Sequence, residues 1–206
     1  MISVVIQAGG ESRRMGQDKG LVQLAGRPLV QHVLDRVAQL GDEVCITTNR
    51  PQAYAFLGVP TASDPQSGLG ALAGLRTALQ AARSDTVLVV ACDMPFLEPA
   101  LLRHLLSRAG EAEVVIPRRN AEFEPLHAVY RRSCLTALEA ALARGEARMI
   151  SFFPDVRLLP IDEPELSAYD PEGLSFFNVN TPDDLIRAER LLQAASSQPT
   201  EDIHDD

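Results

Sequence analysis

The sequence predicts an α/β fold, a three-layer α/β/α sandwich in which helices cover both faces of a mainly parallel sheet. The first observation is alternation, because short runs of β-branched residues are separated by segments whose apolar residues recur at helical spacing. The second is residues 86–92, a continuous apolar run that is typical of a strand buried on both faces. Parallel strands need long crossover connections, usually helices, and the helical segments supply them.

Composition indicates one globular domain without nucleic-acid or membrane partners. The 206 residues are 46% hydrophobic and 23% charged, which suits a single domain that we place at residues 1–195. Residues 196–206 are acidic and lack an apolar face, so we expect a disordered tail. The net charge of −9 disfavours nucleic acid and membrane surfaces, and no apolar run reaches the ~20 residues of a membrane span. Three widely spaced cysteines, an odd number, indicate a reducing, cytoplasmic compartment.

A glycine turn and a group of cations follow the first expected strand, residues 2–6. The strand stops at Ala8, Gly9 and Gly10, where adjacent glycines let the backbone approach another group closely. Three cations come soon after this turn: Arg13, Arg14 and Lys19. Backbone N–H groups and cations together suit a polyanion such as a nucleoside triphosphate, although a solvated basic loop has the same composition. The spacing fits neither the Walker loop nor the G-x-G-x-x-G dinucleotide motif, so a nucleotide loop here is of another kind.

The next segments form a strand–helix–strand unit. After an apolar connector at residues 20–26, Pro28 suits the first turn of a helix that runs to Gln39, and Gly41 is a plausible stop. The other elements expected in this part are a strand at 44–48, a short helix at 51–57 and a short strand at 60–62.

Three glycines surround the start of a helix that we expect to run to Ala82. Gly68, Gly70 and Gly74 would each cost about 1 kcal/mol relative to alanine inside a helix. They therefore indicate a helix start whose backbone closely approaches either the sheet or a ligand.

Asp93 follows the most convincing buried strand, residues 86–92. An acidic side chain at the carboxyl end of a central strand lies where open α/β sheets bind their ligands, although a turn or capping aspartate fits this position equally well. Pro99 then begins another expected helix, which runs to Leu106.

The second half of the chain continues the alternation and ends in a capped helix. Thr181 is placed to cap a helix that begins at Pro182 and runs to about Ala195. Pro160 removes a ladder donor, which predicts an edge strand. The remaining elements expected here are a strand at 114–117, a polar loop at 118–123, a strand at 124–130, a helix at 135–142, a short helical stretch at 145–149 and the edge strand at 156–161.

The four histidines are scattered along the chain. None is spaced with a serine, a cysteine or a second histidine as in a hydrolase or a zinc site. The sequence therefore shows no obvious covalent nucleophile.

Residues 7–19 resemble the signature L-A-G-G-x-S-x-R-M-G-x-D-K of the molybdenum cofactor guanylyltransferases. The match includes both glycines of the turn, then Arg14, Met15, Gly16, Asp18 and Lys19, and Gln7 stands where the family has leucine. Four further segments resemble family elements: 70–74 (G-P-L-A-G, with alanine for proline), 92–95 (C-D-x-P), 125–130 (P-L-x-A-x-Y) and 176–185 (F-x-N-x-N-T-P-x-D-L). The resemblance extends from residue 2 to about residue 192.

This resemblance implies a fold, a reaction and a set of site residues. The fold is a Rossmann-like sheet with one antiparallel strand. The reaction is transfer of GMP from GTP to Mo-molybdopterin with release of pyrophosphate, with Mg²⁺ as cofactor and molybdoenzyme maturation proteins as a further class of partner. The implied catalytic residues are Arg14, Lys19 and Asp93, and the implied Mg²⁺ ligands are Asp93 and Asn180. The implied nucleotide-binding residues are Gln7, Ala8, Gly9, Gly10, Lys19, Asn49, Asp64, Gly70 and Asp93.

Two other functions remain open at this point. One is a CTP-dependent cytidylyltransferase that acts on molybdopterin or another small phosphate. By the resemblance, the Ala-Gly-Gly turn favours guanine, since cytidylyl relatives more often carry Ala-Ala-Gly, whereas Gln7 departs from the family and weakens that preference. The other is a non-catalytic nucleotide-binding maturation partner, against which the presence of Lys19 and Asp93 argues.

Overall fold

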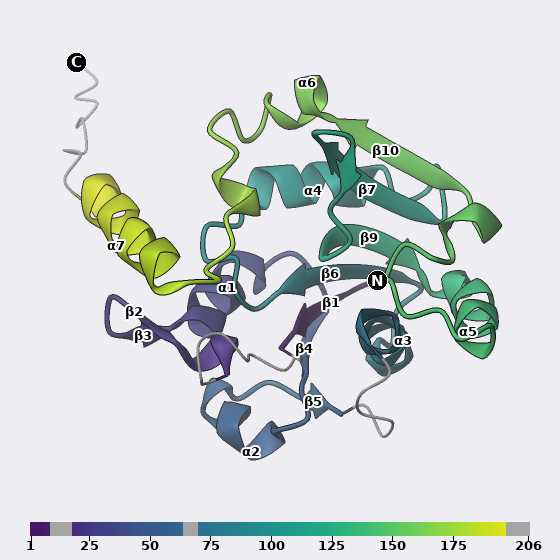
Figure 1. The fold of residues 1–206 in the computed structure, drawn as a ribbon, viewed down its shortest axis with the longest axis horizontal. Coiled ribbons are helices and arrows are strands. Elements are labelled where there is room, and N and C mark those ends of the chain that lie inside the picture. Colours follow the sequence, from purple (N-terminus) through teal and green to yellow (C-terminus); the bar gives the residue numbers. More distant parts are fainter. Residues whose placement is uncertain (9–17, 64–69, 197–206) are drawn as a thin grey trace.

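The computed structural model describes residues 1–8, 18–63 and 70–196, and these form the predicted three-layer sandwich (Figure 1). Its main sheet has the strand order β10-β7-β9-β6-β1-β4-β5, with β8 paired to β7. The strands are β1 (Ile2–Gln7), β4 (Glu43–Thr47), β5 (Thr61–Ala62), β6 (Thr86–Ala91), β7 (Val114–Arg119), β8 (Glu122–Phe123), β9 (His127–Arg131) and β10 (Leu158–Asp162).

β1 lies inside the sheet and pairs in parallel with β4 on one side and β6 on the other. Its apolar side chains alternate between the two faces, so that Val4 and Ile6 enter one hydrophobic cluster and Val5 enters the other. β9 runs antiparallel to both β6 and β7, which confirms the expected antiparallel strand. β10 is an edge strand and contains Pro160, as predicted.

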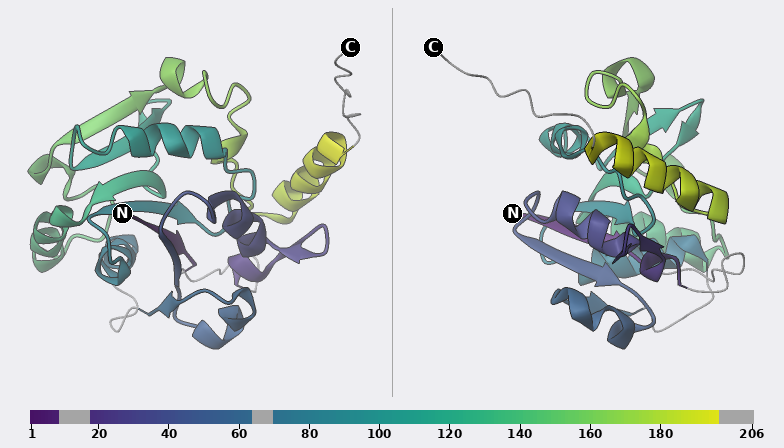
Figure 2. Two further views of the ribbon diagram at one scale, coloured as in Figure 1. Left: turned by 180° about the vertical axis from the view of Figure 1, so that it is seen from behind. Right: turned by 90° about the vertical axis from the view of Figure 1, so that its left-hand side faces the viewer.

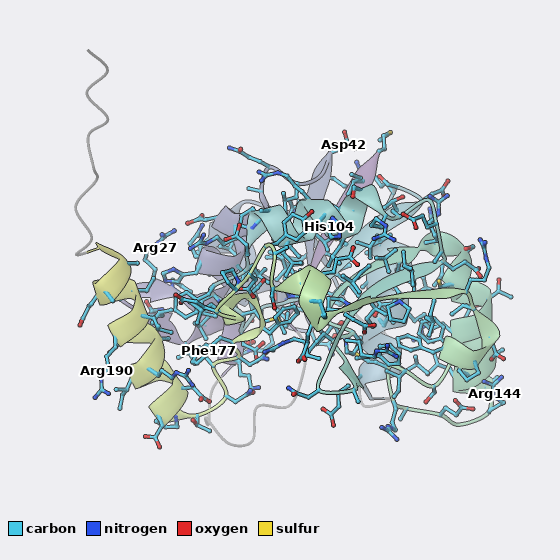
Figure 3. The ribbon with its side chains drawn as sticks, turned by 90° about the horizontal axis from the view of Figure 1, so that it is seen from above. Arg27, Asp42, His104, Arg144, Phe177 and Arg190 are labelled. Carbon is cyan, nitrogen blue, oxygen red and sulfur yellow. The ribbon has the colours of Figure 1, made fainter. Side chains whose placement is uncertain are left out.

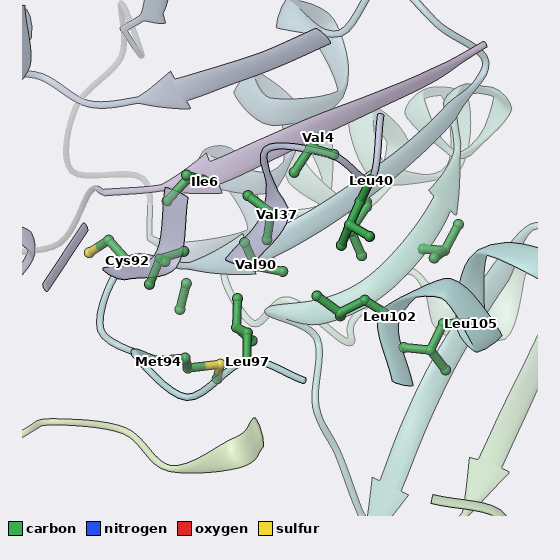
Figure 4. Packing of buried hydrophobic residues seen from close by; sticks show 14 of the residues in the cluster. Val4, Ile6, Val37, Leu40, Val90, Cys92, Met94, Leu97, Leu102 and Leu105 are labelled. Atoms are coloured by element: carbon green, nitrogen blue, oxygen red, sulfur yellow. The ribbon is translucent and has the colours of Figure 1, made fainter. Parts of the chain in front are cut away.

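Two pairs of helices cover the sheet. α1 (Leu29–Val37) and α4 (Pro99–Ser107) pack on one face, where Val37, Leu102 and Leu105 belong to the same hydrophobic cluster as Val4 and Val90 (Figure 4). α3 (Ala71–Ala81) and α5 (Leu135–Ala143) pack on the other face. Shorter elements are α2 (Pro51–Tyr54), α6 (Glu163–Leu166) and the 3-10 helices η1 (Lys19–Leu21), η2 (Ala55–Leu57), η3 (Arg132–Cys134), η4 (Phe153–Asp155) and η5 (Leu174–Phe176). None of the helices within the described ranges is long and apolar enough to cross a membrane.

The last helix, α7 (Pro182–Ser196), stands beside the sandwich rather than on a face of the sheet (Figure 2). It packs on a small hairpin of β2 (Gln23–Leu24) and β3 (Arg27–Pro28) through a third hydrophobic cluster, which includes Leu24, Val179 and Ala188. Phe177 lies next to the start of α7, and the guanidinium of Arg187 lies 5.2 Å from the centre of its ring (Figure 3).

Four local predictions were wrong. The connector expected at residues 20–26 instead leads into the β2–β3 hairpin and includes its turn residues Ala25 and Gly26, which have φ of 50° and 76°. A two-residue turn with positive φ matches the twist of paired strands. Such a turn usually has glycine or asparagine at its first position, so Ala25 does not identify it in the sequence. As a result, Pro28 ends β3 and precedes α1, instead of lying in its first turn. Residues 145–149 form turns, not a helix, and part of the expected polar loop at 118–123 forms β8.

Candidate active site

The carboxyl ends of three central strands meet at one edge of the sheet. Gln7 ends β1, and it is in register with Thr47 at the end of β4 and with Ala91 at the end of β6. Because β9 runs in the opposite direction, its first residue, His127, lies at the same edge, opposite Val90. This is the edge at which open α/β sheets bind their ligands.

Three polar residues from distant parts of the chain come together here, and we call Lys19, Asp93 and Asn180 the open cluster. The Nζ of Lys19 donates to Oδ2 of Asp93 at 3.1 Å and to Oδ1 of Asn180. The side chains of Lys19 and Asp93 are 32% and 12% exposed, so solvent still reaches the ammonium. The sequence resemblance implied roles for all three, and in the structure Lys19 contacts both Asp93 and Asn180.

Main-chain contacts hold Asp93 and Asn180 together. Asp93 follows β6, and its carbonyl accepts a hydrogen bond from the N–H of Val179 at 2.9 Å. This bond fixes the segment that carries Asn180 beside the end of β6. The N–H of Cys92 donates to the carbonyl of Gln7 at 3.2 Å, so the turn after β6 also stays attached to β1.

Asn180 is further positioned by the start of α7. The N–H groups of Asn180 and Thr181 donate to Oδ2 of Asp184 at 3.0 and 2.9 Å, and the N–H of Asp184 donates to the Thr181 hydroxyl at 3.2 Å. This reciprocal pattern confirms Thr181 as a cap. Burial raises the pKa of Asp184, but these hydrogen bonds outweigh it and leave the pKa below its usual value. Asn178 bonds the Phe176 carbonyl through its side chain, which agrees with a turn-forming role.

The backbone around Lys19 is held by Tyr54 of α2. The Tyr54 hydroxyl donates to Oδ1 of Asp18 at 2.5 Å, and the N–H of Gly20 donates to the same oxygen at 3.3 Å. A Cβ at Gly20 would lie 2.6 Å from the Tyr54 oxygen, so this close approach requires glycine. Burial raises the pKa of Tyr54 far above its usual value, so the hydroxyl remains a donor. This contact could not be predicted from the sequence, because the two residues are 36 positions apart.

Gln7 lies under the first turn of α3. Its side-chain nitrogen touches the position that a Cβ of Gly74 would occupy, which explains the glycine there. Within the described residues, Oε1 of Gln7 and Oγ1 of Thr47 are buried without a hydrogen-bond partner. Two unpaired oxygens at this edge are unusual in a protein interior.

The other expected nucleotide-binding residues differ in their exposure and in whether the structure describes them. Gly70 precedes α3 with φ of 86°, and a Cβ there would lie 3.0 Å from that of Ala147, so its glycine requirement already has a structural reason. Ala8 is buried and donates its N–H to the Thr47 carbonyl at 2.8 Å, whereas Asn49 is exposed after β4. The expected residues Gly9, Gly10, Arg14 and Asp64 lie outside the described residues.

A second polar group at the same edge was missed by the sequence analysis, and we call His127, Asp170 and Ser175 the closed cluster. Nε2 of His127 lies 3.3 Å from the Ser175 hydroxyl, although the two residues are 48 positions apart. His127 is fully buried, which lowers its pKa to about 3, with a further contribution from the charge of Arg119. A neutral, inaccessible imidazole is not a general base for an outside substrate.

The cysteines also lack the properties of a nucleophile. Burial raises the pKa of Cys45 to about 11 and that of Cys134 to about 12, and it raises the pKa of Cys92 further. Thiols of this kind are inert.

As a place for a metal ion, the open cluster offers a carboxylate oxygen and an amide oxygen. The described part of the chain contains no group of three His, Cys, Asp or Glu side chains that could hold a metal by itself. Two hard oxygen donors suit Mg²⁺, which usually keeps several waters and takes further ligands from substrate phosphates.

Comparison with known proteins shows close similarity over most of the chain. Residues 4–157 match the model of the MobA-like NTP transferase domain. A probable molybdenum cofactor guanylyltransferase of Pelotomaculum thermopropionicum is 38% identical over 92% of this chain and 92% of the relative. The molybdenum cofactor guanylyltransferase of Desulfosudis oleivorans is 34% identical over 94% of this chain and 96% of the relative.

A solved structure has the same architecture. The molybdopterin-guanine dinucleotide biosynthesis protein A of Archaeoglobus fulgidus superposes with a TM-score of 0.81 at 30% sequence identity. The alignment covers 93% of this chain and 99% of that one.

Proposed function

The chain belongs to the MobA-like NTP transferase family and to its molybdenum cofactor guanylyltransferases, and on this premise we propose that it transfers GMP from GTP to Mo-molybdopterin and releases pyrophosphate. The enzyme class, a nucleotidyltransferase, follows from the family. The nucleotide, the acceptor and the roles of individual residues are the proposal.

The observation that carries the proposal is the open cluster. Asp93 and Asn180 lie 74 and 161 positions after Lys19 in the sequence. The three residues nevertheless meet at the edge of the sheet where open α/β sheets bind ligands. A cation, a carboxylate and an amide oxygen are the groups that transfer of a nucleotidyl group requires, because its transition state concentrates negative charge on phosphate oxygens.

The proposed mechanism is a direct displacement. The terminal phosphate of the pterin attacks the α-phosphorus of GTP, the bond to the β-phosphate oxygen breaks, and pyrophosphate leaves. Asp93 and Asn180 would hold Mg²⁺, which neutralises charge on the triphosphate when bound. Lys19 and Arg14 bind the triphosphate and offset the charge that moves toward the departing pyrophosphate. The protein's contribution is therefore position and electrostatics.

A covalent enzyme intermediate is disfavoured by the residues described. The three cysteines are buried, with pKa values above their usual range, and His127 lies in the interior with its pKa depressed. Neither kind of side chain can supply a nucleophile to a bound triphosphate.

Guanine recognition is assigned to the ends of β1 and β4. We infer that Ala8, Gly9 and Gly10 contact the nucleotide through their backbone, and that Asn49 and Asp64 contact the base or ribose. Gln7 lies next to these residues, with its oxygen lacking a hydrogen-bond partner within the described chain, and so it belongs to the same proposed base-binding region.

The test is a comparison of nucleotides in two assays. With Mg²⁺ present, GTP should raise the melting temperature more than CTP, UTP or ATP, because a ligand stabilises the state that binds it. Radiolabelled GTP and Mo-molybdopterin should then give the guanine dinucleotide and pyrophosphate in equal amounts. A larger stabilisation by CTP, with CMP transfer, would replace the guanylyl assignment by the cytidylyl one. Stabilisation by GTP without any transfer would refute the proposed acceptor.

A further inference from the structure

Lys19 occupies a position that a metal ion also suits. Its Nζ contacts Oδ2 of Asp93 and Oδ1 of Asn180, the two oxygens that the proposed function gives to Mg²⁺. An ammonium group and a metal ion cannot both lie between the same two oxygens at contact distance. The two cations must therefore exclude each other there.

Asp93 explains why a cation is needed at this point. Its side chain is only 12% exposed, and a carboxylate withdrawn from water needs a paired charge. Across the described ranges, Lys19 is the basic side chain that forms an ion pair with it. In the absence of metal, the ammonium thus supplies the charge that the carboxylate requires.

The backbone of Lys19 is fixed, whereas its side chain can move. Asp18 and Gly20, the neighbours on either side, are both held at Tyr54, the first by a hydrogen bond and the second by close packing. The Lys19 side chain itself is 32% exposed and has a flexible four-carbon stem. It can leave the two oxygens by rotation of its own bonds, without a shift of the chain.

The choice of lysine is distinctive in this sequence. Of the 19 lysines and arginines in the chain, Lys19 alone is a lysine. An ammonium is a compact point charge that fits between two oxygens as a small metal ion does, whereas a guanidinium is a planar fork. The open cluster therefore contains the one basic side chain whose shape allows this substitution.

We propose that Lys19 is a placeholder for the metal: its ammonium and Mg²⁺ compete for the same oxygens of Asp93 and Asn180, and metal binding releases the amine toward the anionic substrate. This inference depends on the proposed function for the identity of the metal ligands. The inference adds an order of events to the proposed function. The Lys19 ammonium becomes available to the triphosphate only after the metal has replaced it at Asp93 and Asn180.

The single lysine allows a direct test by NMR. Protein labelled with ¹³C at lysine gives one Hε–Cε signal, which belongs to Lys19 without further assignment. Titration with MgCl₂ alone should move this signal in a saturable way, and KCl at matched ionic strength should not. In Asp93→Asn the signal should already lie near its Mg²⁺-saturated position and respond little to metal. A wild-type signal that does not move, or that moves equally with KCl, overturns the proposal.

A second measurement separates competition from simple charge repulsion. If Lys19 occupies the oxygens about nine-tenths of the time, Lys19→Met raises the apparent Mg²⁺ affinity about tenfold. The matched control is Arg50→Met, which removes a nearby positive charge, 3.9 Å from Asp18, without touching Asp93. Affinities are measured from the melting temperature as a function of MgCl₂. Equal gains in the two variants contradict the proposal.

Neither measurement uses GTP or turnover. Failure of GMP transfer would refute the proposed function and leave the cation exchange standing, whereas an unresponsive lysine signal would refute the exchange alone.

Discussion

The open and closed clusters lie at the same edge of the sheet but satisfy their polar groups in opposite ways. In the closed cluster, Asp170 accepts from the N–H groups of Leu174 and Ser175 at 3.0 Å each, and the Ser175 hydroxyl accepts from the N–H of Glu98 at 2.9 Å. The rings of His127 and Phe176 are in contact, with centres 4.5 Å apart and planes inclined by 32°. Asp170 and Ser175 are paired within the cluster, whereas Nδ1 of His127 is buried without a hydrogen-bond partner among the described residues. The cluster connects the chain segment before α7 to the sheet.

The open cluster instead leaves a charge within reach of solvent. Lys19 bonds both Asp93 and Asn180, but a third of its side chain is exposed, and the contact is made through the long, flexible stem of the lysine. The difference supports the open cluster as the proposed ligand site. A buried, inaccessible cluster whose carboxylate is held by main-chain N–H groups stabilises the fold, and one whose partners can be exchanged is suited to binding.

The largest expected effect comes from removing the carboxylate of the open cluster. Asp93→Asn should lower GMP transfer by at least about a thousandfold, since loss of a bound metal removes several kcal/mol of transition-state stabilisation. The rate of pyrophosphate release at limiting Mg²⁺ measures it. The matched control is Asp170→Asn, which should lower the melting temperature and leave the rate near that of the wild type. A large loss of transfer rate in Asp170→Asn, or a transfer rate near that of the wild type in Asp93→Asn, would show that the two clusters do not differ in function.

The next effect concerns the cation. Lys19→Ala should reduce kcat about 10²–10³-fold, by analogy with the loss of one preorganised donor to a transition-state oxyanion. With Mg²⁺ present as the alternative partner of Asp93, the melting temperature should change little. Lys19→Arg should remain slow as well, because a guanidinium does not reproduce a compact ammonium. Wild-type kcat in Lys19→Ala would mean that this lysine belongs to a solvated loop.

A smaller effect on kcat is expected for Tyr54, which contacts the neighbours of Lys19 and not the open cluster itself. Tyr54→Phe removes the hydroxyl that holds Asp18, a hydrogen bond to a charged group worth about 1.5–3 kcal/mol in general. We expect kcat to fall several-fold with little change in KM, because Lys19 is less well positioned. Tyr130→Phe is the matched control, since that buried hydroxyl donates to the Pro125 carbonyl away from Lys19. In a Lys19→Ala background, Tyr54→Phe should have no further effect on kcat, and an additive loss would show that it acts elsewhere.

The smallest effect on activity belongs to the closed cluster, where the expected change is in stability. Burial depresses the pKa of His127 to about 3, so the unfolded chain binds more protons below the ordinary histidine pKa. Its contribution to stability is complete above about pH 6.5 and is lost by up to about 1.4 kcal/mol per pH unit as the pH falls toward 3. His127→Gln should flatten the dependence of the melting temperature on pH between 6.5 and 4, with transfer at pH 8 preserved. Parallel pH curves for the two proteins would remove His127 from this role.

The main framework could be predicted from the sequence because it depends on local patterns. The alternation of β-branched runs and helical spacing located the strands and helices of the sandwich, and Pro160 marked the edge strand. Asp93 was found as a candidate because an acidic residue after a buried central strand has a known place in such sheets. These inferences need only neighbours in sequence.

The parts that could not be predicted depend on contacts between distant side chains. The Tyr54–Asp18 bond, the His127–Ser175 contact and the unpaired oxygen of Gln7 arise from tertiary packing, which leaves no periodic trace. The β2–β3 hairpin was missed because Ala25 takes the positive φ that usually identifies such a turn through glycine or asparagine. Asn180 was included only through the family resemblance, since nothing in its spacing relates it to Lys19.

The wide separation of the open cluster along the chain affects when the protein can act during its synthesis. Domains fold from the N-terminus as the ribosome extends the chain by about 5–20 residues per second. The pairing of β1 with β4 and β6 can form once residue 91 has emerged, yet Asn180 lies 161 positions after Lys19. A nascent chain can therefore assemble the centre of the sheet while its cation site is still incomplete. On the proposed function, nucleotide transfer therefore begins only after Asn180 has emerged and joined Lys19 and Asp93.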